Sequence, residues 1–396
     1  MIAAMDKTRD LLVCGWRSIP HSYAVVSEYQ CLELLRRGPG LRLFFQDMPY
    51  FNSSWQAAGG MHGAESEAAL RSIPPPPADL RADAELRIEY PYDLQRPARA
   101  ARATVFGTAE FLCVPSSYIA AGIDVVEAQK RNGFRILTPS DWSKRGFVRS
   151  GVAAENVSVL PLGFDPMLFH PVTWERRAEI RAELGYSLDE FVFYSAGSMT
   201  RNKGLRFLLP AFARLAQTHS HVRLLLKGVD SLYSSKQIFE AQLGSLEPEA
   251  VRAVTGRTRY LGGQMSFAEM ASLYQASDCY VSPYVAEGFN MPVLEAAACG
   301  LPVICTAGGA TDDFVTEDFA LQIASTLEPL AIPNTPQAMG MIPDLEHLMH
   351  LMLCVADDAE FRASARIAGP AYVGERFTWS KVVDRLLPVI LPEDPA

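Results

Sequence analysis

The hydrophobic positions of this chain repeat one arrangement, a short apolar run followed by a stretch with a single apolar face. Near the start, residues 11–14 and 41–45 are such runs, and the stretch between them, from Ser22, has an apolar face. Short apolar runs predict buried strands, and apolar positions three to four residues apart predict helices. Strand–helix–strand order predicts a parallel sheet covered by helices.

The same alternation continues along most of the chain, with one interruption. Residues 49–77 show little periodicity and end in four consecutive prolines, which predict extended chain. Elsewhere the pattern predicts strands at 104–106, 134–137, 157–160, 191–195, 222–226, 259–261, 279–282 and 302–305. It predicts helices near 118–130, 141–149, 205–217, 267–275, 291–299, 345–356, 360–368 and 379–387.

A segment rich in glycine and proline, residues 161–171, divides this alternation into two halves. Such segments are typical of domain boundaries, and 396 residues are enough for two domains with separate cores. We therefore predict an α/β protein of two Rossmann-like domains, at 1–165 and 166–375, followed by a terminal helix in 376–396.

Composition narrows the class of protein. Hydrophobic residues make up 49% of the chain and charged residues 20%, which is typical of globular domains. No apolar run reaches 18 residues, so we expect no transmembrane helix. The seven cysteines are dispersed and form no C-x-x-C pair. This pattern indicates buried thiols in a reducing cytoplasm.

The net charge of −9 is distributed unevenly. Residues 1–150 carry 18 basic and 16 acidic side chains, a net of +2, so the remainder carries −11. An acidic chain without a basic stripe is not expected to bind nucleic acid. The weakly basic first half is compatible with an anionic acceptor or with peripheral contact to a membrane surface.

Residues 283–295 carry the most specific chemistry of the sequence. They follow an apolar run and lead into a predicted helix that Asn290 can cap, with Pro292 suited to its first turn. The backbone N–H groups of Gly288, Phe289 and Asn290 then lack intrahelical partners. Such groups bind phosphate well, so we predict a site for a phosphate-bearing ligand.

Two carboxylates flank this predicted site, Glu287 in the loop and Glu295 inside the helix. The carboxylate in the helix can accept two ribose hydroxyls, as acidic residues do in dinucleotide-binding folds. The one in the loop can accept hydroxyls of a second sugar. The alternative is a helix start with acidic residues that the helix dipole favours by itself. On these residues alone both interpretations stay open.

The whole stretch resembles the signature of glycosyltransferase family 4, a Glu-x7-Glu motif within a run such as E-G-F-G-x-P-x-x-E-A-x-A-x-G-x-P-V-I. Asn290 replaces the usual second glycine, and asparagine tolerates the positive φ of such a position. This departure bears on the donor-sugar preference. The resemblance extends to 137–171 and 196–204. It implies the GT-B fold, in which two Rossmann-like domains face each other across a cleft and the last helix crosses back to the first domain.

Under this resemblance the chain is a retaining, metal-independent hexosyltransferase (EC 2.4). It would transfer a sugar from a UDP- or GDP-sugar to a carbohydrate, another small molecule or a lipid-linked acceptor. Glu295 would hold the ribose and Glu287 the donor sugar. The other implied donor-binding positions are Gly288, Phe289, Asn290, Met291, Val293, Leu294 and Ser198. The resemblance also implies bacterial polysaccharide or glycoconjugate biosynthesis, in the cytoplasm or at the inner face of the membrane.

A basic loop follows the first strand of the second half. Family members carry an arginine there and, about five residues later, a lysine before glycine, both against the donor diphosphate. Lys203 and Gly204 match this pattern, but Ser198 stands at the arginine position, with Arg201 as a nearby substitute. Two cations here would neutralise charge on a departing nucleotide diphosphate. The alternative is an exposed loop with two solvated bases.

The acceptor-side candidates lie in loops of the first half. Trp16 suits stacking on a sugar ring, although packing is the commoner use of an aromatic side chain. His21 stands at a helix start. Thr108 and Glu110 lie where many relatives have a donor-contacting histidine, which therefore has no counterpart here. Glu110 is a candidate base or hydroxyl ligand, and a structural role is the alternative for each.

No metal site or cofactor is predicted. The sequence has no D-x-D between strands, and its seven histidines lack ligand spacing. Two other functions remain open, a sugar-nucleotide epimerase of the same fold and a catalytically weak nucleotide-sugar-binding protein. Products would distinguish them, because only a transferase forms an acceptor-linked sugar.

Overall fold

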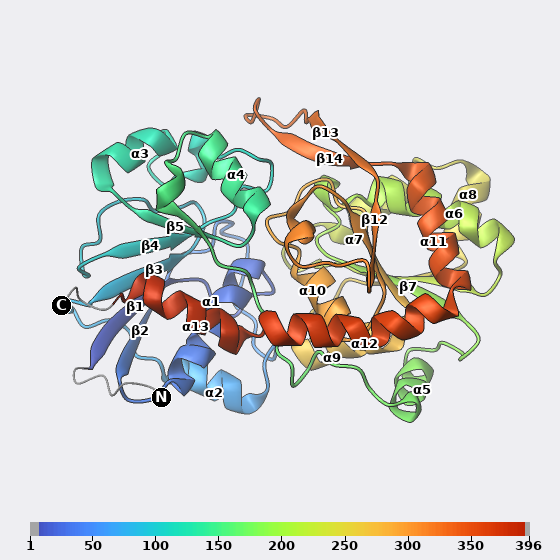
Figure 1. The fold of residues 1–396 in the computed structure, drawn as a ribbon, viewed down its shortest axis with the longest axis horizontal. Helices are drawn as coiled ribbons and strands as arrows, with labels where there is room; N and C mark the ends of the chain where they lie inside the picture. Colours follow the sequence, from blue (N-terminus) through green and yellow to red (C-terminus); the bar gives the residue numbers. More distant parts are fainter. Residues whose placement is uncertain (1–7, 393–396) are drawn as a thin grey trace. The chain divides into compact units, whose positions relative to one another are not determined.

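A computed structural model describes residues 8–392 and divides them into two compact units. Unit 1 comprises residues 8–163, 331–338 and 379–392, and unit 2 comprises residues 164–330 and 339–378. Figure 1 shows the strands and helices of both units along the chain. The end of the predicted terminal segment, 393–396, lies outside the described residues.

Unit 1 contains a six-stranded sheet in the order β2-β1-β3-β4-β5-β6, with all neighbours parallel. This order extends the flavodoxin-like arrangement of doubly wound folds. Its strands are β1 Arg9–Gly15, β2 Leu41–Asp47, β3 Ala84–Ile88, β4 Ala103–Phe106, β5 Arg135–Thr138 and β6 Val157–Val159. Its helices are α1 Ser22–Arg36, α2 Ala64–Ser72, α3 Val125–Asn132, α4 Asp141–Arg149 and α13 Trp379–Ile390. The last helix packs on α1, where Trp379 stacks on Tyr29 with ring centroids 5.4 Å apart.

Unit 2 contains a parallel sheet in the order β12-β11-β10-β7-β8-β9, the strand order of a dinucleotide-binding Rossmann fold. Its strands are β7 Phe191–Ala196, β8 Val222–Lys227, β9 Thr258–Leu261, β10 Cys279–Ser282, β11 Val303–Thr306 and β12 Ala320–Ile323, with an antiparallel pair β13 Ser325–Pro329 and β14 Met339–Pro343. Its helices are α5 Trp174–Glu183, α6 Leu205–Thr218, α7 Ser235–Gly244, α8 Pro248–Thr255, α9 Phe267–Ala276, α10 Met291–Ala298, α11 Leu345–Asp357 and α12 Ala359–Arg376. Helix α12 packs along α10 (Figure 1). The predicted α/β fold class is confirmed.

Three elements of unit 1 depart from the expectation. Helix α3 begins at Val125 and not near residue 118, where Ser116–Tyr118 form a separate 3-10 helix. Helix α2 lies inside the stretch 49–77, which was predicted to lack periodic structure. Strand β3 was not predicted at all, because it carries the buried charged residues Glu85 and Arg87. Their side chains pair with each other, with Arg87 Nε 2.6 Å from Glu85 Oε1. This pairing permits charge inside a sheet, where an unpaired charge is costly.

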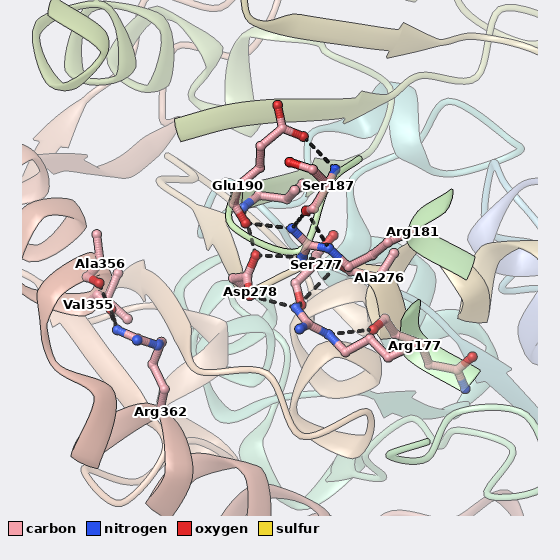
Figure 2. A network of polar contacts seen from close by, with 12 residues as sticks. Arg177, Arg181, Ser187, Glu190, Ala276, Ser277, Asp278, Val355, Ala356 and Arg362 are labelled. Atoms are coloured by element: carbon pink, nitrogen blue, oxygen red, sulfur yellow. Dashed lines mark hydrogen bonds and ion pairs between the residues drawn. The ribbon is translucent and has the colours of Figure 1, made fainter. Parts of the chain in front are cut away.

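A buried charge network secures the amino ends of β7 and β10 (Figure 2). The fully buried Arg181 of α5 donates to Asp278 Oδ2 at 2.9 Å and to the carbonyl oxygen of Ser187 at 2.7 Å. Arg177 donates to the other carboxylate oxygen of Asp278 at 2.5 Å. The same carboxylate accepts the backbone N–H of Val192 at the start of β7. The network therefore ties α5 to the sheet at the edge opposite its carboxyl ends.

We expect Arg181→Met to lower the free energy of unfolding of unit 2 by about 3 kcal/mol or more, because it leaves Asp278 without one of its two cations in a mostly buried place. Urea unfolding followed by circular dichroism measures the change. The exposed Arg176→Met on the same helix is the matched control and should shift it by less than about 0.5 kcal/mol. Equal midpoints for both variants would contradict a structural role for the network.

Candidate active site

The strand order of unit 2 reverses between β7 and β10, since β8 and β9 lie to one side and β11 and β12 to the other. Ligands of open α/β sheets bind at the carboxyl ends of strands at such a point. Here the loops after the two strands are joined by two hydrogen bonds. Val285 N donates to Asn202 O at 2.7 Å, and Asn202 Nδ2 donates to Ala286 O at 3.1 Å.

The close approach of these loops depends on Gly204. Its φ is 74°, and a Cβ atom there would lie 1.7 Å from the carbonyl oxygen of Pro283. Only glycine fits such a position. The preceding Lys203 then reaches across the junction, and its Nζ lies 2.5 Å from Glu287 Oε1. The structure thus joins the predicted phosphate contact Lys203 and the predicted sugar contact Glu287 as an ion pair whose carboxylate is buried.

The start of α10 differs from the prediction in one respect. Asn290 does not cap the helix with its side chain, which donates instead to Ser282 Oγ at 2.9 Å. Its φ is 78°, so the expected tolerance of positive φ is confirmed. Within residues 8–392, the backbone N–H groups of Phe289, Asn290 and Met291 donate no hydrogen bond. Amides without partners at a helix start favour an anion.

Other predicted donor-binding residues differ in their accessibility. The side chains of Val293 and Leu294 are fully buried in the core, so they offer no surface to a donor. Gly288 is buried and Met291 is half-buried. In the loop after β7, Ser198 Oγ lies 2.6 Å from Thr200 Oγ1.

Arg201 is exposed, and no ion pair of its guanidinium is found in the described part of the chain. The sequence analysis did not identify a second cation near this loop, Arg206. Arg206 lies in the first turn of α6, and its pKa is lowered by burial and by the charge of Arg201. A cation in the first turn of a helix opposes the helix dipole, and this unfavourable position in the sequence could have indicated a functional role for Arg206. Two arginines therefore flank the loop that carries Lys203.

Glu295 projects from α10 beside α9. The hydroxyl of Tyr274 donates to Glu295 Oε2 at 2.7 Å. Within the described chain the other carboxylate oxygen, Oε1, accepts no hydrogen bond, and the residue is half-buried. One oxygen is thus fixed and the other remains available. Tyr274 was not predicted, since nothing in a helical tyrosine at that position signals such a contact.

The surroundings of Glu295 are aromatic. Three fully buried tyrosines pack there, with the Tyr194 and Tyr274 rings 4.9 Å apart and the Tyr194 and Tyr280 rings 5.5 Å apart. The hydroxyl of Tyr194 has no hydrogen-bond partner among residues 8–392. Burial raises the pKa of Glu295 to about 7, and the hydrogen bond from Tyr274 opposes this rise. The titratable groups facing it are Tyr194, Tyr274, Tyr280 and Cys299.

We expect nucleotide affinity to rise with pH up to about 7 and to level off above it, because only the ionised Glu295 is a strong hydrogen-bond acceptor. Tyr274→Phe removes a contact that lowers the pKa of Glu295, so the midpoint of this profile should move to higher pH. Calorimetric titration with nucleotide across this range measures it. Tyr194→Phe is the control, because it removes from the same cluster a hydroxyl that has no partner in the described part of the chain. Identical profiles for the two variants would rule out the role of Tyr274.

The acceptor-side candidates meet at the carboxyl ends of β1 and β4. His21 caps α1, because its Nδ1 accepts the Tyr23 N–H at 3.2 Å. The Tyr23 hydroxyl lies 3.3 Å from Thr108 Oγ1. Trp16 is 1% exposed and donates to the Pro49 carbonyl, so its ring packs inside unit 1 and has no free face for a sugar.

Glu110 lies near a group of tyrosine hydroxyls in unit 1. Burial and the charge of Glu110 together raise the pKa of Tyr90 to about 12. Burial and Glu110 also raise the pKa values of Tyr23 and Tyr118. Glu110 and Thr108 therefore both lie near Tyr23.

Among residues 8–392 no three His, Cys, Asp or Glu side chains are grouped to hold a metal ion. No helix in that range is long and apolar enough to cross a bilayer.

Part of the chain resembles known glycosyltransferases. Residues 190–334 match the family Glycosyl transferases group 1. Curated relatives include the D-inositol 3-phosphate glycosyltransferase of Segniliparus rotundus, 29% identical over 59% of this chain and 46% of the relative. Another is the lipopolysaccharide 1,2-N-acetylglucosaminetransferase of Salmonella typhimurium, 28% identical over 47% of each chain. The chain spans about half the length of the curated relatives it matches.

Solved structures are similar over nearly the whole chain. Anabaena HepE, in complex with UDP-glucose, has a TM-score of 0.69 and 16% identity, covering 96% of this chain and 99% of that one. WaaG, a glycosyltransferase involved in lipopolysaccharide biosynthesis, has a TM-score of 0.62 and 15% identity, covering 96% and 99%. These likenesses show the GT-B fold. All but the last four residues of the match to glycosyl transferases group 1 lie in unit 2, which carries Lys203, Glu287 and Glu295.

Proposed function

We propose that this protein is a retaining glycosyltransferase of family 4 that moves a hexosyl group from a nucleotide diphosphate-sugar to an acceptor. The observation that carries the proposal is the junction of the loops after β7 and β10. There an ion pair, a set of unpaired amides and a carboxylate with one available oxygen lie at the switch point of a Rossmann sheet. The donor is a UDP- or GDP-sugar.

Each group of the junction has a role in this proposal. The Phe289, Asn290 and Met291 amides bind the diphosphate, and Glu295 Oε1 accepts the ribose hydroxyls. Lys203 neutralises charge on the departing diphosphate, with Arg201 and Arg206 beside it, and this kind of stabilisation is large in a site that excludes water. Glu287 accepts hydroxyls of the donor sugar. No divalent ion is required, because cations and helix-start amides supply the positive charge.

The ion pair has a consequence for donor binding. Lys203 and Glu287 neutralise each other in the structure, so a bound donor must separate them or extend the network. Each partner gains a replacement contact, Lys203 with a phosphate oxygen and Glu287 with sugar hydroxyls. The exchange maintains pairing of a buried carboxylate, which would otherwise be costly.

On the acceptor side, unit 1 offers His21, Thr108 and Glu110 near Tyr23. We propose a carbohydrate, another small molecule or a lipid-linked sugar as acceptor. The reaction then belongs to bacterial polysaccharide or glycoconjugate synthesis, in the cytoplasm or at the inner face of the membrane.

The proposal is tested in two steps. A thermal-shift screen with UDP, GDP, ADP and their sugars identifies the donor, because a ligand that binds the folded state raises the melting temperature. The selected donor is then incubated with candidate acceptors, and products are identified by mass spectrometry. An acceptor-linked sugar with inverted configuration would contradict retention. An epimerised donor would favour the epimerase, and binding without any product would favour a binding protein.

A further inference from the structure

A cavity of about 560 Å³ lies in unit 1, apart from the residues assigned above. Ser18, three residues beyond the end of β1, and Asp47, the last residue of β2, both line it. It therefore opens at the carboxyl edge of the sheet, where α/β folds bind their ligands. Its volume lies within the range of about 300–1,000 Å³ that is typical of small-molecule sites.

The floor of the cavity is a buried polar pair. Glu28 of α1 and His62 have side chains that are 3% and 5% exposed, with Oε2 and Nε2 3.1 Å apart. The other oxygen of Glu28 accepts the Ser18 N–H at 2.7 Å. Ser18 has a φ of 62°, which is rare for a residue other than glycine, and such strain concentrates at functional sites. The carboxylate holds this strained turn at the cavity edge.

The two cations that line the cavity are already paired. Arg17 binds both oxygens of Asp47, at 2.9 and 2.6 Å, and donates to the carbonyl oxygen of Leu70 at 2.9 Å. Arg71 pairs with Glu67 at 3.1 Å. Together with Glu28, the lining carries three carboxylates and two arginines, a formal charge of −1 when His62 is counted as neutral. An anion that entered would meet no unpaired cation, and burying an unpaired charge is costly.

The remaining lining is apolar and suits the faces of a sugar ring. It includes Met61, Leu70 and the ring of Tyr50, whose hydroxyl is engaged with the carbonyl oxygen of Arg17 at 2.7 Å. Apolar walls with a few oriented polar groups are typical of small-molecule sites. Carboxylate oxygens accept hydrogen bonds from hydroxyl groups without any change of charge.

We propose that this cavity binds an uncharged saccharide and selects neutral over phosphorylated acceptors. The inference rests on the proposed transferase function and adds the substrate class of its acceptor side. A saccharide donates hydroxyls to the carboxylates and covers the apolar walls. A phosphate on the same ring would face a lining of net negative charge.

Binding to the full chain tests the proposal directly. Methyl α-D-glucopyranoside and maltose serve as neutral probes, and glucose 6-phosphate and D-inositol 3-phosphate as anionic ones, in saturation-transfer NMR with calorimetry. We expect binding of at least one neutral probe and affinity at least about tenfold weaker for the anionic probes. Tighter binding of an anionic probe, or no binding of any neutral one, would overturn the proposal.

A filling variant locates the binding site. Ala57 is exposed and lines the cavity, so Ala57→Trp should fill it without disturbing the core, and saccharide affinity should fall by at least about tenfold. Ala68 is exposed on α2 outside the lining, and Ala68→Trp is the matched control with unchanged affinity. Equal saccharide binding by the two variants would show that the saccharide binds elsewhere, against the proposal.

A charge variant tests the selection itself. Asp47→Asn releases the Arg17 guanidinium into the cavity, and we expect binding of glucose 6-phosphate to tighten by about tenfold at low salt. Unchanged discrimination would contradict the role of the paired cations. Thermal stabilisation by nucleotide-sugar is measured on the same proteins. If it is absent while saccharide binding follows the expected pattern, the transferase function fails and the cavity assignment stands.

Discussion

Lys203→Ala is expected to lower kcat by about 10²–10³-fold while the affinity for the donor changes little. A cation placed against a departing diphosphate interacts most strongly in the transition state, and loss of one such contact has this magnitude. Steady-state kinetics with the donor identified by thermal shift gives kcat and KM separately. An unchanged kcat with a raised KM would make Lys203 a binding residue only.

The ion pair with Glu287 makes a control necessary. Removing Lys203 leaves a buried carboxylate without its partner, which destabilises a protein by several kcal/mol, so part of any loss of activity reflects instability. Lys203→Ala combined with Glu287→Gln removes both charges. We expect the double variant to regain stability towards urea but not kcat. Recovery of both would assign the defect to folding.

Glu295→Gln is expected to weaken nucleotide-sugar binding by at least about 100-fold, because two hydrogen bonds from ribose hydroxyls to a charged oxygen each contribute about 1.5–3 kcal/mol. Calorimetry on the variant measures it, and nucleotide-sugar should no longer raise its melting temperature. If the variant bound the donor as tightly as the unmodified protein, Glu295 would not be the residue that binds the ribose.

The pH dependence of the stability of Glu295→Gln tests whether Glu295 is buried in the folded protein. The pKa of Glu295 is raised by burial to about 7 from its ordinary value of 4.5. Ionising it in the folded state is therefore unfavourable, so the unmodified protein loses stability as pH rises from about 4.5 to about 7. Glu295→Gln lacks this loss. The free energy of unfolding of the variant, compared with that of the unmodified protein at the same pH, should therefore be higher at pH 8 than at pH 5. The opposite trend would contradict the buried environment of Glu295.

The hydrophobic pattern was sufficient to predict the bounds of elements whose local preferences agree with their place in the tertiary structure. Strand β10 and helix α4 begin and end at the predicted residues. Gly300 has a positive φ, 78°, just after α10, as glycine commonly does at the end of a helix. Apolar runs, capping residues and glycine influence only the few residues around them, so their effects can be predicted from the local sequence.

The pattern failed where distant residues supply the stabilisation. β3 contains Glu85 and Arg87, which look exposed until the fold pairs them with each other. The side chain of Asn290 could cap a helix, but it donates a hydrogen bond to Ser282 across the loop. Trp16 lies in a loop and yet packs inside unit 1. In each case the partner is chosen by the tertiary structure and leaves no local signal.

By itself, the sequence determined two α/β domains and the segment that holds Glu287 and Glu295, because strand–helix alternation and the spacing of a helix start are local properties. Only the tertiary structure decided which groups meet. It joined Lys203 to Glu287 through the contact of Gly204 with Pro283, placed Tyr274 on Glu295, and formed the cavity over Glu28 and His62. Lys203 and Glu287 lie 84 residues apart along the chain, and the parallel sheet brings them together because the loops at the carboxyl ends of β7 and β10 share one edge. Tyr274 meets Glu295 because α9 packs against α10.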